Sequence, residues 1–151
     1  MSLYIKLCLC HFAFIMGCGS VGCWVDNRQY PLTIAPELRG PLGRFLEQYP
    51  QAETAMVDLK EALYAPVEYE GHPDWISVCS IYTDGSLEIV VDPYAVGLAL
   101  EWAVWHEACH CLLKQAIGKH SKFPGNLMFD TMPRLDILEK NWPAISLTCI
   151  Q

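Results

Sequence analysis

The stretch Trp105-His106-Glu107-Ala108-Cys109-His110, inside a long apolar segment (residues 94–116), predicts the centre of the fold. If this segment is helical, His106 and His110 lie about 40° apart around the helix axis and about 6 Å apart along it. Two imidazoles placed in this way can bind one Zn²⁺. Glu107 lies about 100° around from His106, where its carboxylate can reach a water on the metal. The stretch therefore predicts two metal ligands and a general base on one helix.

The apolar segment is predicted to be a buried helix rather than a membrane span. Its apolar residues surround the whole circumference, which is typical of a helix in a protein interior. Asp92 is expected to cap the helix, with Pro93 in its first turn. Glu101, Glu107 and the two histidines argue against a membrane span. Such polar side chains need compensation in a soluble core, and a metal ion supplies it.

The residues around this helix predict an α+β fold. Residues 75–82 and 87–92 are rich in strand-forming side chains, and Asp84-Gly85 between them indicates the turn of a β-hairpin. Other expected elements are helices at 41–48, 53–64 and 133–141, a short edge strand at 66–70, and an irregular tail after the last helix. We therefore expect a short mixed or antiparallel sheet, with its hairpin packed on the buried active-site helix.

Length and charge restrict the class of protein. The chain has 151 residues, which suggests one domain, and 52% of its residues are hydrophobic, enough to form a core. Its formal net charge is −7, and its ten basic residues are scattered. Binding to nucleic acid is therefore not expected, because neutralising phosphates needs clustered Lys and Arg.

The N-terminus predicts export. Residues 1–17 contain an apolar run of the length of a signal-peptide core, too short to span a bilayer. The run ends in Ile15-Met16-Gly17-Cys18, which is similar to the sequence at which bacterial lipoproteins are cleaved and lipidated. We predict a lipoprotein-type signal peptide (1–17), a lipid anchor on Cys18, a tether (18–40) and one domain (41–151). The protein is then expected at the cell envelope, held to the membrane by its lipid alone.

Cysteine usage agrees with export, because an oxidising compartment permits disulfides. Without the signal peptide and the lipidated Cys18, five of the eight cysteines remain, so at least one is unpaired. Cys109 and Cys111 point to different sides of the predicted helix and are not expected to pair with each other. Which cysteines pair is left open.

A catalytic zinc site needs a third protein ligand and an open position. The candidates after the helix are His120, Asp130, Asp136 and Glu139. We prefer His120, because it follows a glycine turn at Gly118 that lets the chain fold back under the metal.

These residues resemble the metzincin branch of the zincin metalloproteases over residues 105–129. The resemblance rests on His106-Glu107-x-x-His110, a glycine, His120 and Asn126-Leu127-Met128. It implies a small zincin-like domain with three histidine ligands, Glu107 as the catalytic base and Met128 as the methionine of a turn beneath the metal. In metzincins the third histidine follows six positions after the second, whereas His120 follows ten positions after His110 here.

Two other zinc-protease patterns therefore stay open. His120-Ser121-Lys122-Phe123 resembles the SprT-like proteases, which act on proteins bound to DNA, although the acidic charge and the export signal argue against that group. In a gluzincin pattern, Glu139 would be the third ligand.

The sequence predicts a zinc metallopeptidase that acts on peptides or proteins. Glu107 activates the attacking water, and the strand predicted at 87–91 is expected to pair with an extended substrate. The alternative from another class is a zinc-binding envelope lipoprotein without catalysis.

Overall fold

The structure is a computed structural model that describes residues 30–31, 33–68, 74–114, 120–121, 126–129 and 131–149. The predicted signal peptide, the lipidation site Cys18 and the tether up to residue 29 lie outside these ranges. The candidate ligand Asp130 and the turn glycine Gly118 also lie outside them.

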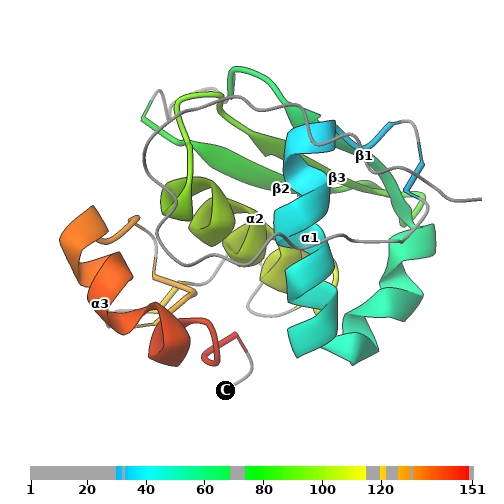
Figure 1. The fold of residues 1–151 in the computed structure, drawn as a ribbon. Helices are drawn as coiled ribbons and strands as arrows, with labels where there is room; N and C mark the ends of the chain where they lie inside the picture. Colours follow the sequence, from blue (N-terminus) through cyan, green and yellow to red (C-terminus); the bar gives the residue numbers. More distant parts are fainter. Residues whose placement is uncertain are drawn as a thin grey trace, which may run out of the picture.

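The described residues form a small α+β domain with four helices and a three-stranded mixed sheet (Figure 1). In chain order, the elements are α1 (Pro36–Gln48), the 3₁₀ helix η1 (Pro50–Val57), β1 (Leu59–Tyr64), β2 (Ser77–Ile81), β3 (Leu87–Val91), α2 (Leu98–Cys111) and α3 (Leu135–Ile145). The expected fold class is confirmed at this level. No helix within the described ranges is both long and apolar enough to cross a bilayer.

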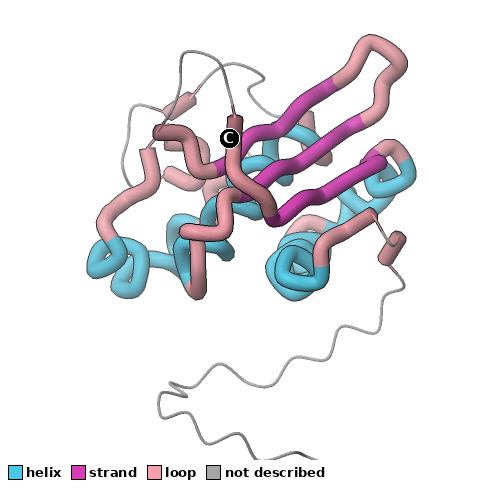
Figure 2. The backbone as a smooth tube through the Cα atoms, turned by 90° about the horizontal axis from the view of Figure 1, so that it is seen from above, coloured by secondary structure: helices cyan, strands magenta, loops and turns pink. Residues whose placement is uncertain are grey.

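The sheet has the order β1-β3-β2, and its strands run side by side in Figure 2. β2 and β3 form the predicted antiparallel hairpin, and Gly85 in its turn has a φ of +86°. β1 pairs with β3 in parallel. The central strand alternates, with Leu87, Ile89 and Val91 buried, as expected for a strand with one face on a core.

The prediction that the strand at residues 87–91 pairs with an extended substrate is wrong. β3 is hydrogen-bonded to neighbours on both sides, so it has no edge to offer a peptide. Ile34 forms a short parallel bridge with Ala62 on the outer side of β1. The outer side of β2 pairs with no described strand, so β2 has an open edge.

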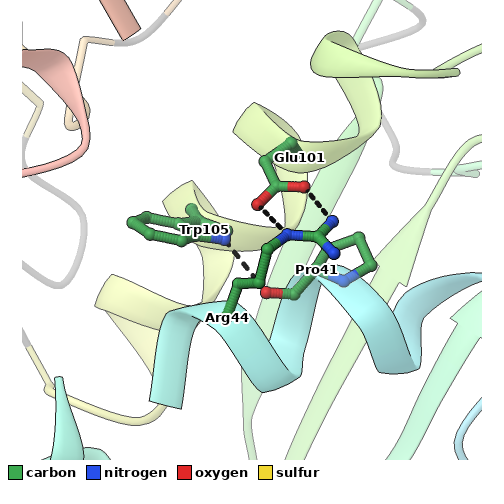
Figure 3. A network of polar contacts seen from close by, with 4 residues as sticks. All are labelled: Pro41, Arg44, Glu101 and Trp105. Atoms are coloured by element: carbon green, nitrogen blue, oxygen red, sulfur yellow. Dashed lines mark hydrogen bonds and ion pairs between the residues drawn. The ribbon is translucent and has the colours of Figure 1, made fainter. Parts of the chain in front are cut away.

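The buried helix α2 lies beneath the sheet and packs against β2, β3, α1 and α3 (Figure 1). Two polar contacts fasten it to α1 (Figure 3). The Arg44 guanidinium donates to both carboxylate oxygens of Glu101, and the Trp105 indole donates to the Pro41 carbonyl over 3.0 Å. The Trp105 ring also packs on Phe45 of α1, with ring centroids 5.6 Å apart. α1 therefore fixes one side of the helix that carries the candidate ligands.

The helix predicted at 53–64 is wrong, because this stretch contains the end of η1 and all of β1. The reason lies in a register shift between Leu59 and Glu61 in the pairing with β3. The shift leaves Lys60 and Glu61 both exposed between buried Leu59 and Ala62. This spacing of three imitates one face of a helix. The parallel partner β3 is also distant in sequence, so no local signal announces it.

Other element boundaries differ from expectation. α1 begins at Pro36 instead of residue 41, so residues 36–40 belong to this helix and not to a tether, and Pro41 lies inside it. α2 begins at Leu98, after Gly97, whose φ is +57°. Asp92 therefore does not cap α2: its Oδ1 accepts a hydrogen bond from the Tyr94 N–H over 2.9 Å and closes an earlier turn.

Two further expectations fail near the ends of the sheet and of the chain. Residues 66–68, which were expected in an edge strand, have no regular structure, and the rest of that strand lies outside the described ranges. α3 runs to Ile145 through Pro143, so the start of the predicted irregular tail is helical.

Candidate metal centre

Two of the candidate ligands come from adjacent turns of α2. His106 and His110 are both buried, and their Nε2 atoms lie 3.2 Å apart. Their spacing of four residues places both rings on one side of the helix. The predicted arrangement of this pair is confirmed.

The third histidine reaches the pair from the chain beyond α2. The Nε2 of His120 lies 3.3 Å from the Nε2 of His110, and its ring stacks on that of His106 with an interplanar angle of 12°. The ligand atoms of the three residues lie within 4.8 Å of one another, so the group can hold a metal ion.

The two distances at His110 fit a tetrahedral site. Zn–N bonds of 2.0–2.1 Å in a tetrahedron place two nitrogen ligands about 3.3–3.4 Å apart. The two Nε2–Nε2 distances of 3.2 and 3.3 Å are close to this value. The Nε2 of His110 contacts the Nε2 atoms of both His106 and His120, and one ring N–H can form a hydrogen bond in only one of these contacts. A shared cation, in contrast, accepts a lone pair from each of the three rings. The residues therefore fit a metal ion.

His106 is held in the tautomer that a metal requires. Its Nδ1–H donates to the Leu127 carbonyl over 2.7 Å, which leaves the Nε2 lone pair directed at the other histidines. Burial lowers the pKa of His106 to about 3; the nearby His110 and His120 also lower it, and the bond to Leu127 opposes them. The ring is therefore neutral at physiological pH, as metal ligation needs.

Glu107 is buried beside this group, in the same cleft. Desolvation raises the pKa of its carboxyl group to about 7, against the lowering effect of two hydrogen bonds. One comes from the Ser77 hydroxyl, which donates to Oε1 over 2.7 Å, and the other from the Cys79 backbone. Both partners belong to the edge strand β2. A carboxyl group with a pKa near 7 can take up and release a proton at neutral pH.

A cleft of about 1060 Å³ opens over these residues. Residues 74–82, which include all of β2, form one wall, and the three histidines, Glu107, Trp102, Thr131 and Met132 line the remainder. The Trp102 ring lies 4.9 Å from that of His106, centroid to centroid. Its buried indole Nε1 has no hydrogen-bond partner, unlike the other buried side-chain nitrogen and oxygen atoms of the described chain. An unpaired buried donor is costly, and this one belongs to a residue of the cleft wall.

The other candidate ligands do not join the group. Asp136 and Glu139 are exposed on α3 and are not part of the histidine cluster found among the described residues. Met128 is buried, and its N–H donates to Asn126 Oδ1 over 2.8 Å. It directly follows Leu127, the residue that holds His106. Its role as a turn methionine stays a prediction.

Two disulfides enclose the C-terminal end of α2. Cys79 of β2 pairs with Cys111, and Cys109 pairs with Cys149 near the C-terminus. The prediction that Cys109 and Cys111 do not pair with each other is confirmed. The two bridges flank His110 on both sides in the sequence, so they tie the second ligand to the sheet and to the chain end.

Sequence reasoning missed Ser77, Cys79 and Leu127 as partners of the site. Ser77 is 30 residues from Glu107, and Leu127 is 21 residues from His106. Leu127 acts through its backbone, for which no side-chain pattern exists. A serine in a strand carries no signal of its own, because its role depends on which helix packs against it.

Comparisons with known proteins give no relative from which a function can be transferred. No family model matches the chain, and neither a curated protein nor a solved structure matches it. A function for this chain therefore rests on the chemistry of the site.

Proposed function

We propose that this chain is a zinc-dependent metallopeptidase, with His106, His110 and His120 as the ligands of the ion. The observation that carries the proposal is the convergence of three imidazoles, in which the Nε2 atoms of His106 and His120 lie 3.2 and 3.3 Å from that of His110. A site with three protein ligands keeps one position open, which is typical of catalytic rather than structural zinc.

The donor set is compatible with zinc. Imidazole suits zinc, copper, iron and nickel, whereas thiolates would add Cu(I) and iron–sulfur centres to the candidates. The four cysteines of the described chain are all in disulfides and offer no thiolate. Three imidazoles beside a buried carboxyl group are typical of a zinc hydrolase.

When bound, zinc supplies the Lewis acidity that makes water a nucleophile near neutral pH. The residues of the chain handle the protons. Glu107 accepts a proton from the attacking water and delivers it to the nitrogen of the leaving amine, as the C–O bond forms and the peptide C–N bond breaks. Ser77 holds the Glu107 carboxylate by its hydroxyl, and the Leu127 carbonyl fixes the tautomer of the His106 ring.

The cleft supports an extended peptide as substrate. The edge strand β2 forms its wall, with Glu107 and the histidines alongside. An extended chain can pair with the open edge of such a strand by main-chain hydrogen bonds. Among the described residues that line the cleft there is no lysine or arginine to bind a phosphate backbone.

The proposal includes a zincin-like site of the metzincin type. It is supported by the order of the ligands, with two on one helix and His120 beyond it, and by the buried Met128 next to Leu127. It also includes export and a lipid anchor at Cys18. The two disulfides support export, because such bonds persist in oxidising compartments.

The test begins with the metal content of the purified mature protein and with cleavage of a peptide library. Glu107→Gln keeps the shape of the side chain and removes the base, so we expect zinc to be retained and cleavage to fall by about 10²-fold or more. Glu139→Gln is the matched control on exposed α3, and it should keep both zinc and activity.

Three results would contradict the proposal. If Glu107→Gln cleaves peptides as well as wild type, Glu107 is not the base. If the wild-type protein holds zinc and cleaves nothing in the library, the chain is a metal-binding protein without catalysis. If Glu139→Gln loses zinc, the third ligand comes from α3, as in the gluzincin pattern.

A further inference from the structure

The first metal ligand is the end of a relay of three hydrogen bonds that starts at the C-terminal end of α3. His106 Nδ1–H donates to the Leu127 carbonyl over 2.7 Å. The N–H of the same Leu127 donates to Thr148 Oγ1 over 2.7 Å, and the Thr148 hydroxyl donates to the Ile145 carbonyl over 2.6 Å. The hydroxyl proton is committed to Ile145, so a lone pair of Oγ1 must face Leu127.

The turn that carries Thr148 is itself fixed to two helices. The Tyr49 hydroxyl at the end of α1 donates to the Ser146 carbonyl over 2.6 Å and accepts from the Cys149 N–H over 3.4 Å. Cys149 is also bonded to Cys109 of α2. Tyr49 and Cys149 are both buried. The Leu127 N–H is therefore held from a rigid support, through Thr148.

We propose that Thr148 is a positioning residue of the metal centre, because it holds the backbone N–H of Leu127, the residue whose carbonyl orients His106. The inference rests on the metal site of the proposed function and needs no catalysis. Outer partners of this kind hold the ring of a metal-binding histidine in place and fix its tautomer. Without the hydroxyl, the Leu127 N–H loses its acceptor, and the Leu127 carbonyl keeps only the support of its own peptide group, whose Met128 N–H donates to Asn126 Oδ1 over 2.8 Å.

A purely structural role is the competing explanation. The bond from Thr148 to Ile145 spans three residues at the end of α3 and would stabilise the helix end by itself. Such a role predicts a change in stability with no change in metal affinity. Thr54 offers a matched control, since its hydroxyl makes the same kind of bond to Gln51, three residues back in η1.

The experiment compares Thr148→Val, Thr148→Ser and Thr54→Val in the mature protein with its disulfides intact. Zinc affinity is measured by competition with a chromogenic chelator, and the visible spectrum of the Co²⁺-substituted protein reports the coordination geometry. We expect Thr148→Val to lose about 10-fold or more in zinc affinity and to change the Co²⁺ spectrum. Thr148→Ser, which keeps the hydroxyl, should restore both, and Thr54→Val should match wild type.

Several outcomes would overturn the inference. If Thr148→Val melts at a lower temperature but binds zinc as wild type does, Thr148 only caps α3. If Thr148→Ser fails as badly as Thr148→Val, the methyl group and not the hydroxyl matters. Should the valine variant not fold, Thr148→Ala provides the same measurement without the added bulk. Wild-type protein that binds neither ion removes both proposals, whereas zinc binding without peptidase activity removes only the proposed function.

Discussion

Removing the cation of the Arg44–Glu101 pair tests how α1 holds the metal-bearing helix. Arg44→Met keeps much of the aliphatic stem and deletes the guanidinium that donates to both oxygens of Glu101 (Figure 3). Glu101 is only 8% exposed, so its carboxylate would stay buried without a partner. This hydrogen-bonded contact also raises the pKa of Arg44, so the guanidinium is charged at every accessible pH.

The magnitude follows from the burial of the two side chains. Breaking a fully buried pair by removing one partner costs about 3–5 kcal/mol. The Arg44 side chain is 32% exposed and that of Glu101 11%, so solvent screening reduces the expected loss to about 2–3 kcal/mol. For a domain of this size, such a loss lowers the melting temperature by about 8–12 °C. Glu101→Gln should cost less, because the freed guanidinium can reach water.

The assay is a double-mutant cycle by urea unfolding, with Arg44→Met, Glu101→Gln and the double variant. We expect the double variant to be more stable than the sum of the single losses predicts, by about 1–3 kcal/mol. Zinc affinity should stay at the wild-type value in all three, because Glu101 lies about 140° around α2 from His106. Additive losses, or an Arg44→Met variant as stable as wild type, would show that the pair does not hold the two helices together.

Two further predictions concern the site itself. Zinc at about 100 times its dissociation constant should stabilise the protein by about 2.7 kcal/mol, which raises the melting temperature by about 10 °C. A chelator should reverse this rise, and His110→Ala should abolish it. Identical melting temperatures of the zinc-loaded and the chelated protein would refute the metal site. In the metal-free protein, His106, with a pKa lowered from 6.5 to about 3, adds stability as pH rises between those values, about 5 kcal/mol in all. Glu107, with a pKa raised from 4.5 to about 7, removes about 3 kcal/mol as pH rises between those values. Together, the two groups should therefore make the free energy of unfolding rise from pH 3 to 4.5, stay level to pH 6.5 and then fall. Urea titration with chelator present measures this free energy at each pH. A steep slope between pH 4.5 and 6.5 that Glu107→Gln leaves unchanged would contradict the assignment.

Local spacing predicted those parts of the molecule that depend on one element at a time. The four-residue spacing of His106 and His110 requires a helix to bring them together, and α2 provides it. The Asp84-Gly85 turn predicted the hairpin, because only a few backbone conformations reverse a chain in so few residues. His120 was placed with them by reasoning from the ligand number of zinc, and the structure brings it to the pair.

Tertiary structure decided everything that depends on which elements meet. β1 was mistaken for a helix, since its register shift imitates helical spacing and its parallel partner lies far along the chain. The sequence predicted β3 as the strand that pairs with substrate, whereas the structure places β3 in the centre of the sheet and β2 at its edge. The order of the strands is known only when all three are paired. Ser77 on Glu107, Leu127 on His106 and Thr148 on Leu127 join residues 21 to 30 positions apart. Local sequence shows the periodicity of one helix or one strand. Hydrogen bonds between elements and disulfide pairs form only when packing brings residues that are distant in the sequence into contact.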